Sequence, residues 1–125
     1  MSAAVSAALM FNLVCSGYAD TLSGAKPGRA AFEATIILDL KHKQWCLYEK
    51  GQACRYVAHI KHVSPYFIVL EKQNDRFNEK DNKRYRFINR VNGSYGFKQQ
   101  NAAFSAFTGA GCAKQPFSGF PEPVF

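Results

Sequence analysis

Short runs of β-branched and aromatic residues recur along this chain from about residue 32 onward, separated by polar, Gly- or Pro-containing breaks. Helical periodicity is scarce, and such runs are typical of strands. The predicted strands span Phe32–Leu40, Trp45–Tyr48, Cys54–Val63, Tyr66–Glu71, Arg84–Val91, Ser94–Gln99 and Ala103–Thr108. Asn92-Gly93, between two alternating segments, is a strong hairpin signal. We therefore expect an all-β domain, a small antiparallel meander of about six to seven strands that curls into a barrel or a sandwich.

The length and composition fit one compact domain. The chain has 125 residues, of which 47% are hydrophobic and 20% charged. A disordered chain would be poorer in apolar residues, so that class is excluded. The polar stretch from Lys72 to Lys83 is predicted to be an exposed loop.

The first nineteen residues carry no charged side chain, so the formal net charge of +7 belongs to the rest of the chain. Their apolar run, from Ala3 to Val14, would reach about 18 Å as a helix, which is too short for a hydrocarbon core of about 30 Å. Small residues follow at Gly17 and Ala19, as at the cleavage site of a secretory signal. We therefore predict a signal peptide over residues 1–19 and no transmembrane segment in the mature form, with Ala25 as the second-choice cleavage site. The alternative is a buried N-terminal helix.

Removal of that leader would leave three parts. Residues 20–31 contain Ser, Gly, Lys and Pro and are expected to form a flexible entry segment, followed by the β-domain over residues 32–112. Residues 113–125 combine prolines with phenylalanines, so this tail is expected to run extended across the surface. Phe117 and Phe120 would cover an open end of the sheet. The alternative for the tail is a segment that docks on a partner.

The exported form would keep Cys46, Cys54 and Cys112 in an oxidising compartment. Cys46 and Cys54 flank a Gly-containing turn between two predicted strands, which brings facing Cα atoms within reach of a disulfide. We therefore expect a Cys46–Cys54 disulfide. Cys112 would remain as a buried thiol or pair with another chain. The spacing of these cysteines does not match a zinc site, and no metal or other cofactor is predicted.

A basic stripe is the best candidate for a binding surface. Strand alternation between residues 83 and 91 sends Arg84, Arg86 and Arg90 to one face and Tyr85 and Phe87 to the other. We expect a positive ridge on an aromatic core, suited to the anionic groups of a cell envelope. The alternative is an outer strand that charge keeps soluble. Because the chain is predicted to be exported, nucleic acid is the less favoured partner.

An enzyme of the small basic ribonuclease type is the alternative function. The required acid, base and charge stabiliser would come from His59 or His62, Glu71, Lys61 and Arg86. Any basic β-domain of this size offers such residues by chance, so no catalytic residue is assigned and a non-catalytic role is favoured. The two histidines would point to opposite faces of a strand, which excludes a shared metal.

Several motifs in order resemble those of a group of small exported proteins of Gram-negative bacteria to which no function is assigned. The motifs are Gln44-Trp45-Cys46, Cys54, Ile88-Asn89-Arg90-Val91-Asn92-Gly93, Gly111-Cys112 and Pro116-Phe117-Ser118-Gly119-Phe120-Pro121. The resemblance spans most of residues 44–121, although Asn92 stands where that pattern usually has Thr. It implies export and a β-domain and supplies no catalytic residues.

Together these features predict a periplasmic or secreted domain. Its expected role is to bind an anionic envelope component or a protein partner through Arg84, Arg86 and Arg90. The ligand and the oligomeric state do not follow from the sequence.

Overall fold

The computed structural model describes residues 9–23, 27–49, 54, 56–73, 83–101, 103 and 105–121. The elements in these ranges are all strands, so the all-β prediction is confirmed. They are β1 (Met10–Ser23), β2 (Gly28–Asp39), β3 (Gln44–Glu49), β4 (Ala58–His59), β5 (His62–Val63), β6 (Phe67–Gln73), β7 (Lys83–Asn89), β8 (Ser94–Gln100) and β9 (Ser105–Pro116). The residues that can be described contain no helix long and apolar enough to span a membrane.

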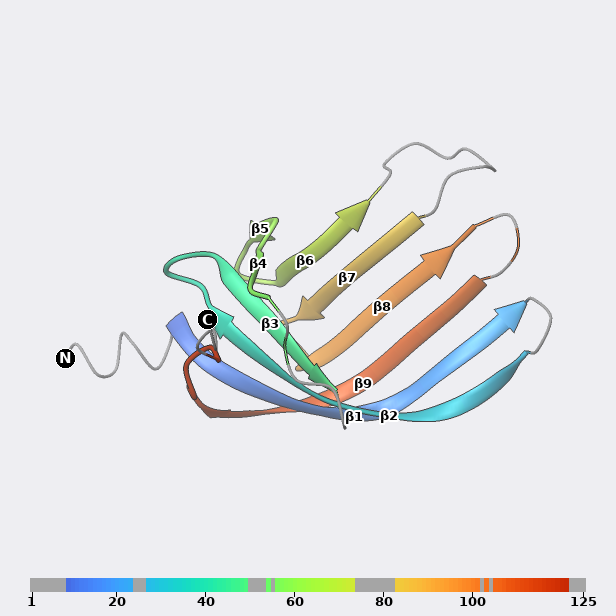
Figure 1. Ribbon diagram of the computed structural model, residues 1–125, viewed down its shortest axis with the longest axis horizontal. Helices are drawn as coiled ribbons and strands as arrows, with labels where there is room; N and C mark the ends of the chain where they lie inside the picture. Colours follow the sequence, from blue (N-terminus) through green and yellow to red (C-terminus); the bar gives the residue numbers. More distant parts are fainter. Residues whose placement is uncertain are drawn as a thin grey trace.

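The described strands form one antiparallel sheet in the order β4-β3-β2-β1-β9-β8-β7-β6-β5. Each strand lies beside its neighbour in the chain, except that β4 and β5 form the two edges, and the last strand pairs with the first. The chain is therefore a meander whose two ends are joined through β1 and β9. Figure 1 shows this sheet curled into a half-barrel.

Ile60 and Lys61 connect the two edges of the curled sheet. The N–H of Ile60 donates to the carbonyl of Lys43 at 2.8 Å, and the N–H of Lys61 donates to the carbonyl of Val69 on β6 at 2.9 Å. Ile60 is only 1% exposed, so this link packs into the core. Beyond it, in the part of the chain that is described, β4 pairs with only two residues of β3 and β5 with only two residues of β6. The half-barrel is thus closed at the link and opens along a seam between β3 and β6.

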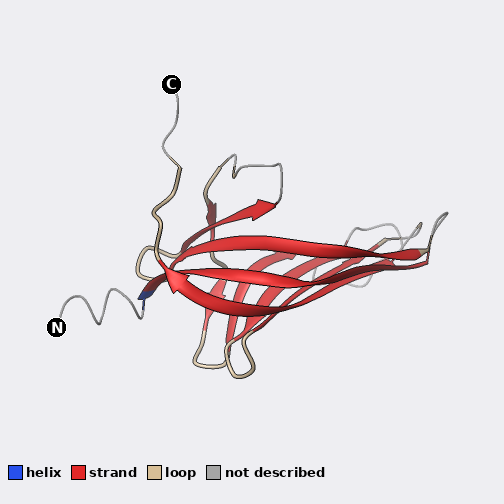
Figure 2. Ribbon diagram, turned by 90° about the horizontal axis from the view of Figure 1, so that it is seen from below, coloured by secondary structure: helices blue, strands red, loops and turns tan. Residues whose placement is uncertain are grey.

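The hydrophobic core lies on the inner face of the half-barrel. On β1, Leu13 and Cys15 are buried, whereas Val14 is 46% exposed, as strand alternation requires. The rings of Phe32 on β2 and Tyr95 on β8 stack with centroids 5.5 Å apart, although β1 and β9 lie between them in the sheet. Such a contact requires curling, which the second view also shows (Figure 2). The buried core comprises Phe11, Leu13, Cys15, Ile36, Leu38, Leu40, Trp45, Ile60, Ile68, Leu70, Ile88, Tyr95, Phe97 and Ala110.

The C-terminal tail covers part of the outer face. Asn12, Ile37 and Cys46 form one cross-strand row opposite the core, and all three are nevertheless buried. The N–H of Ser118 donates to Asn12 Oδ1 at 3.3 Å, which ties the tail to the β1 end of this row. Residues 113–116, predicted as tail, instead continue β9, because they pair with β1. Within the tail, Phe117 packs edge-to-face against Phe120, with ring centroids 5.7 Å apart.

The first strand is the largest departure from the sequence prediction. Residues 10–19, interpreted as part of a signal peptide, belong to β1 in the middle of the sheet, and residues 20–31, interpreted as a flexible entry, belong largely to β1 and β2. On the inner face of β1, Phe11, Leu13 and Cys15 belong to the core, which explains their apolar character. Close packing between strands explains the glycine at position 17, because a side chain there would collide with the backbone of Gly109 on β9.

Most of the predicted strands match observed ones. The exceptions are Cys54–Val63, of which only Ala58–His59 and His62–Val63 are strands, and the domain start at residue 32, which lies inside β2. The Asn92-Gly93 hairpin is confirmed between β7 and β8: Gly93 has a φ of 71°, and its N–H donates to the carbonyl of Asn89 at 2.9 Å. The predicted loop from Lys72 to Lys83 is described only at its ends, which belong to β6 and β7.

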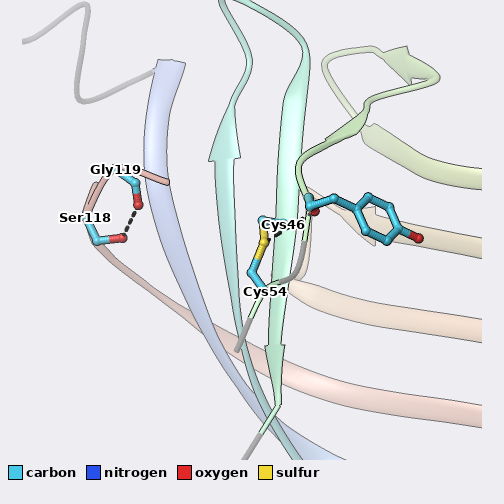
Figure 3. Close-up of a disulfide and its surroundings, with 5 residues drawn as sticks. Cys46, Cys54, Ser118 and Gly119 are labelled. Atoms are coloured by element: carbon cyan, nitrogen blue, oxygen red, sulfur yellow. Dashed lines mark hydrogen bonds between the residues drawn. A yellow bond between two sulfur atoms is a disulfide. The ribbon is translucent and has the colours of Figure 1, made fainter. Parts of the chain in front are cut away.

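Two disulfides crosslink the sheet. Cys46 pairs with Cys54, as expected, with Cα atoms 5.8 Å apart (Figure 3). Cys112 was expected to be a free thiol or an intermolecular crosslink, and this is wrong: it pairs with Cys15, which lies directly opposite on β1. The Cα atoms of this second pair are 4.0 Å apart. Because Cys15 was predicted to belong to the cleaved leader, the prediction left Cys112 without an intramolecular partner.

Truncation tests whether β1 is part of the folded domain. A chain that starts at Asp20 lacks Phe11, Leu13 and Cys15 and leaves β2 and β9 without their common neighbour, so we expect it to lose cooperative thermal unfolding by circular dichroism. A chain that starts at Leu9 keeps every described residue and should unfold like the full sequence. Cooperative unfolding of the Asp20 chain would show that β1 is dispensable.

The two disulfides should differ in their contribution to stability. The Cys15–Cys112 bond spans 97 residues and the Cys46–Cys54 bond spans 8. By loop entropy, C15S/C112S should lower the free energy of unfolding by about 4.7 kcal/mol and C46S/C54S by about 2.5 kcal/mol. Chemical denaturation of both double variants measures the two values. A larger loss for the short loop would contradict this order.

Candidate functional site

The arginines of β7 do not form the exposed ridge that the sequence predicted. Arg84 and Arg86 share one face, as expected, but this is the inner face, on which the buried Ile88 also lies. Arg86 is only 9% exposed. Arg90 follows the end of the strand and is exposed, and its Nη1 donates to the carbonyl of Ser64 at 2.9 Å. The alternation was assigned correctly, and the choice of core face was wrong.

The aromatic residues of β7 explain that error. Tyr85 and Phe87 lie on the outer face, where their ring centroids are 5.2 Å apart. Phe87 also contacts Phe67 of β6 and covers Gly96 of β8, where a Cβ atom would collide with its ring. The outer face therefore has its own aromatic cluster, and the sequence interpretation mistook the residues of this cluster for core residues.

Arg86 is held inside the half-barrel by aromatic side chains. Its Nη1 donates to the hydroxyl of Tyr95 at 2.7 Å. Its guanidinium carbon lies 3.8 Å from the ring centroid of Phe97 and 5.5 Å from that of Trp45. Burial raises the pKa of Tyr95 to about 12, although the adjacent Arg86 charge and hydrogen bond act to lower it. Tyr95 is therefore a neutral partner of Arg86 at neutral pH.

A β-bulge positions the acidic residue beside these arginines. The register between β6 and β7 shifts between Val69 and Glu71, so Glu71 is the cross-strand partner of Arg86. The Glu71 carboxylate accepts a hydrogen bond from Arg84 Nε at 2.8 Å. Arg84 thus has an acidic partner, whereas the group that Arg86 contacts directly is the hydroxyl of Tyr95.

A cleft of about 280 Å³ opens along the seam. One wall comes from β3 and the segment that the Cys46–Cys54 disulfide ties to it, and the other wall comes from β6 and β7. The lining residues are Trp45, Cys46, Leu47, Glu49, Cys54, Tyr56, Ala58, Glu71, Arg84 and Arg86. The cleft combines apolar side chains such as Leu47 and Ala58 with two arginines and two glutamates, so polar and apolar groups both face it.

A second hollow, here called the basic groove, lies where β6, β7 and β8 end. Its volume is about 470 Å³, and it is lined by Lys72, Gln73, Lys83, Arg84, Tyr85, Lys98 and Gln100. Four of these seven residues are cationic and none is acidic. Lys72 and Lys98 are the cross-strand partners of Tyr85 on either side of β7, so the three residues form one row on the same face. The sequence interpretation missed Lys72, Lys83 and Lys98, because the pairing of their strands cannot be seen in the linear sequence.

The residues considered for hydrolysis do not meet. His59 lies on β4 and His62 on β5, both exposed, whereas Glu71 and Arg86 line the cleft in the seam. The described part of the chain holds no group of three or more His, Cys, Asp or Glu residues that could bind a metal ion. The shared-cleft geometry that the ribonuclease alternative needs is therefore absent from the described residues.

One ion pair that the sequence did not indicate supports a turn rather than a site. Asp39 Oδ1 accepts a hydrogen bond from the backbone N–H of His42 at 3.0 Å, and Oδ2 lies 2.7 Å from His42 Nδ1. Burial acts against the charged form of Asp39, but the hydrogen bonds from His42 outweigh it and lower its pKa. The pair stabilises the connection between β2 and β3.

The chain matches no protein-family model, no curated protein and no solved structure. The cleft and the basic groove are therefore the features of the described residues that bear on function.

The raised pKa of Tyr95 predicts a pH dependence of stability. An unfolded tyrosine loses its proton near pH 10, and Tyr95 in the folded protein loses it at about 12. Between these values the folded state binds more protons, so the contribution of Tyr95 to stability is complete below pH 10 and is lost as the pH rises to 12. Two pKa units correspond to a loss of roughly 3 kcal/mol.

Denaturation from pH 8 to 11.5 measures this loss, with Tyr95→Phe as the control that should show a shallower decline. Absorbance titration of the native protein should resolve one tyrosine that ionises well after the others. If all six tyrosines ionise together near pH 10, the environment described for Tyr95 is wrong.

Proposed function

We propose that the protein is a non-catalytic binding domain that acts in the periplasm or outside the cell and binds an anionic component of the envelope through the basic groove. The observation that carries the proposal is that four of the seven described residues lining the groove are cationic, Arg84 among them although it also pairs with Glu71. The formal net charge of +7 favours anionic partners in general. The two disulfides indicate an oxidising compartment. The resemblance to small exported proteins agrees with this placement and remains a prediction.

The groove suits a chain of anionic groups better than a single ion. Lys72 and Lys98 approach from strands on either side of β7, and Tyr85 between them offers an aromatic ring as a platform. Lysine ammonium groups are mobile point charges that follow successive phosphates or carboxylates without requiring one geometry. An acidic polysaccharide or a layer of anionic head groups would present such a series. An acidic protein surface is the related partner that the same groove would recognise.

Paired lysine substitutions test the role of the groove. K72Q/K98Q removes two groove charges, and the control K41Q/K61Q removes two exposed charges elsewhere, so each lowers the formal net charge of +7 by 2. Exposed ion pairs contribute about 0.2–1 kcal/mol each, so we expect the groove pair to weaken binding about two- to thirtyfold. The control pair should change binding by less than about twofold, because screening weakens the effect of distant charges.

Binding is measured at low salt on immobilised polygalacturonate and on phosphatidylglycerol vesicles. The proposal is supported if K72Q/K98Q weakens retention on one of the supports and K41Q/K61Q does not. The support on which this happens identifies the class of anion. Equal effects of the two pairs would show that binding depends only on the net charge of the protein and not on the groove. The absence of binding to both supports would overturn the proposal.

A further inference from the structure

Two buried N–H groups inside the half-barrel have no hydrogen-bond acceptor among the described residues. They are Arg86 Nε and Trp45 Nε1, and their residues are only 9% and 7% exposed. Folded proteins satisfy nearly all buried polar groups, because an unsatisfied buried donor destabilises the fold. Two such donors in one small domain therefore require an explanation.

Both donors belong to the same cleft. Trp45 and Arg86 line opposite walls of the seam, one on β3 and the other on β7, and the guanidinium carbon lies 5.5 Å from the indole ring centroid. The two strands are far apart in the order of the sheet and meet only because the sheet curls. Nothing in the local sequence of either strand accounts for the pair.

Arg86 also has a charge that no described carboxylate neutralises through an ion pair. Glu71, the nearest acidic residue in register, pairs with Arg84 instead. The direct partner of Arg86 is the Tyr95 hydroxyl, which remains neutral because burial raises its pKa to about 12. A buried cation without an anionic partner is costly, so an anion in the cleft would supply both a countercharge and an acceptor.

We propose that the cleft binds a small monocarboxylate whose oxygens accept hydrogen bonds from Arg86 Nε and Trp45 Nε1. The apolar part of such a ligand would lie against Leu47 and Ala58, which also line the cleft. The volume of about 280 Å³ fits a compact acid and not a polymer. Glu49 and Glu71 balance the formal charges of Arg84 and Arg86 in the same cleft, so a phosphate dianion would be repelled more strongly than a monocarboxylate. Arg84 lines both hollows, but neither of the two donor residues, Arg86 and Trp45, lines the basic groove.

Trp45 is the only tryptophan in the chain, so its fluorescence reports directly on the cleft. Titration with phenylacetate and with hexanoate at millimolar concentrations should change Trp45 emission and saturate. Phenylacetamide, which keeps the shape and loses the charge, should bind at least about tenfold more weakly, as expected when a charge-assisted hydrogen bond is lost. Phenyl phosphate should also bind more weakly than phenylacetate.

Substitutions separate the two donors. Arg86→Met removes the charge and Nε, and we expect a loss of phenylacetate affinity of about tenfold to a hundredfold by calorimetry. Trp45→Phe removes the indole N–H together with part of the ring but keeps an aromatic side chain, and the lost hydrogen bond should cost about two- to tenfold. This variant keeps the test open if the Arg86 variant fails to fold. K72Q/K98Q should bind phenylacetate like the unmodified protein.

No response to either acid, equal binding of acid and amide, or full affinity in the folded Arg86→Met variant would each overturn this site. These outcomes are independent of polymer binding by the groove. A loss of phenylacetate affinity in K72Q/K98Q equal to that in Arg86→Met would also overturn it, because the effect would then follow net charge.

Discussion

The pairing of β1 with both β2 and β9 is the interaction on which the rest of the structure depends. It joins the first four strands of the meander to the last five and brings Phe11, Leu13 and Cys15 to the inner face. The Cys15–Cys112 disulfide fixes the register between β1 and β9. Without this junction the sheet would be two separate meanders, and neither could enclose the interior that holds Arg86.

The curl of the sheet brings polar groups from distant strands together beside the hydrophobic core. Trp45 and Arg86 come from strands that four others separate in the sheet order, and they meet across the half-barrel. The short edges β4 and β5, joined by Ile60 and Lys61, close one end and leave the seam open farther along. The cleft therefore exists because the two edges meet over only part of their length. The basic groove has a different origin, in the side-by-side ends of β6, β7 and β8.

The sequence predicted the strands of the second half well, because Asn92-Gly93 and the alternation around it are local signals. It failed where long-range packing decides. The uncharged stretch around Cys15 has the composition of an export signal and also that of a strand buried between two others, and composition does not separate these. Likewise, alternation grouped Arg84 with Arg86 but could not show that Tyr85 and Phe87 have an aromatic cluster of their own on the outer face. The candidate site forms only because the sheet curls, and no local sequence pattern predicts this curl.

The arrangement of the meander also bears on how the chain assembles. β1 is the first described strand to be synthesised and β9 the last, yet they form one of the longest ladders in the sheet. Until β9 leaves the ribosome, one edge of β1 has no native partner and remains open to pairing with other chains. Contacts so distant in sequence form slowly, because the loop between them must close first. We therefore expect the pairing of β1 with β9, and not the formation of hairpins between consecutive strands, to limit the rate of folding.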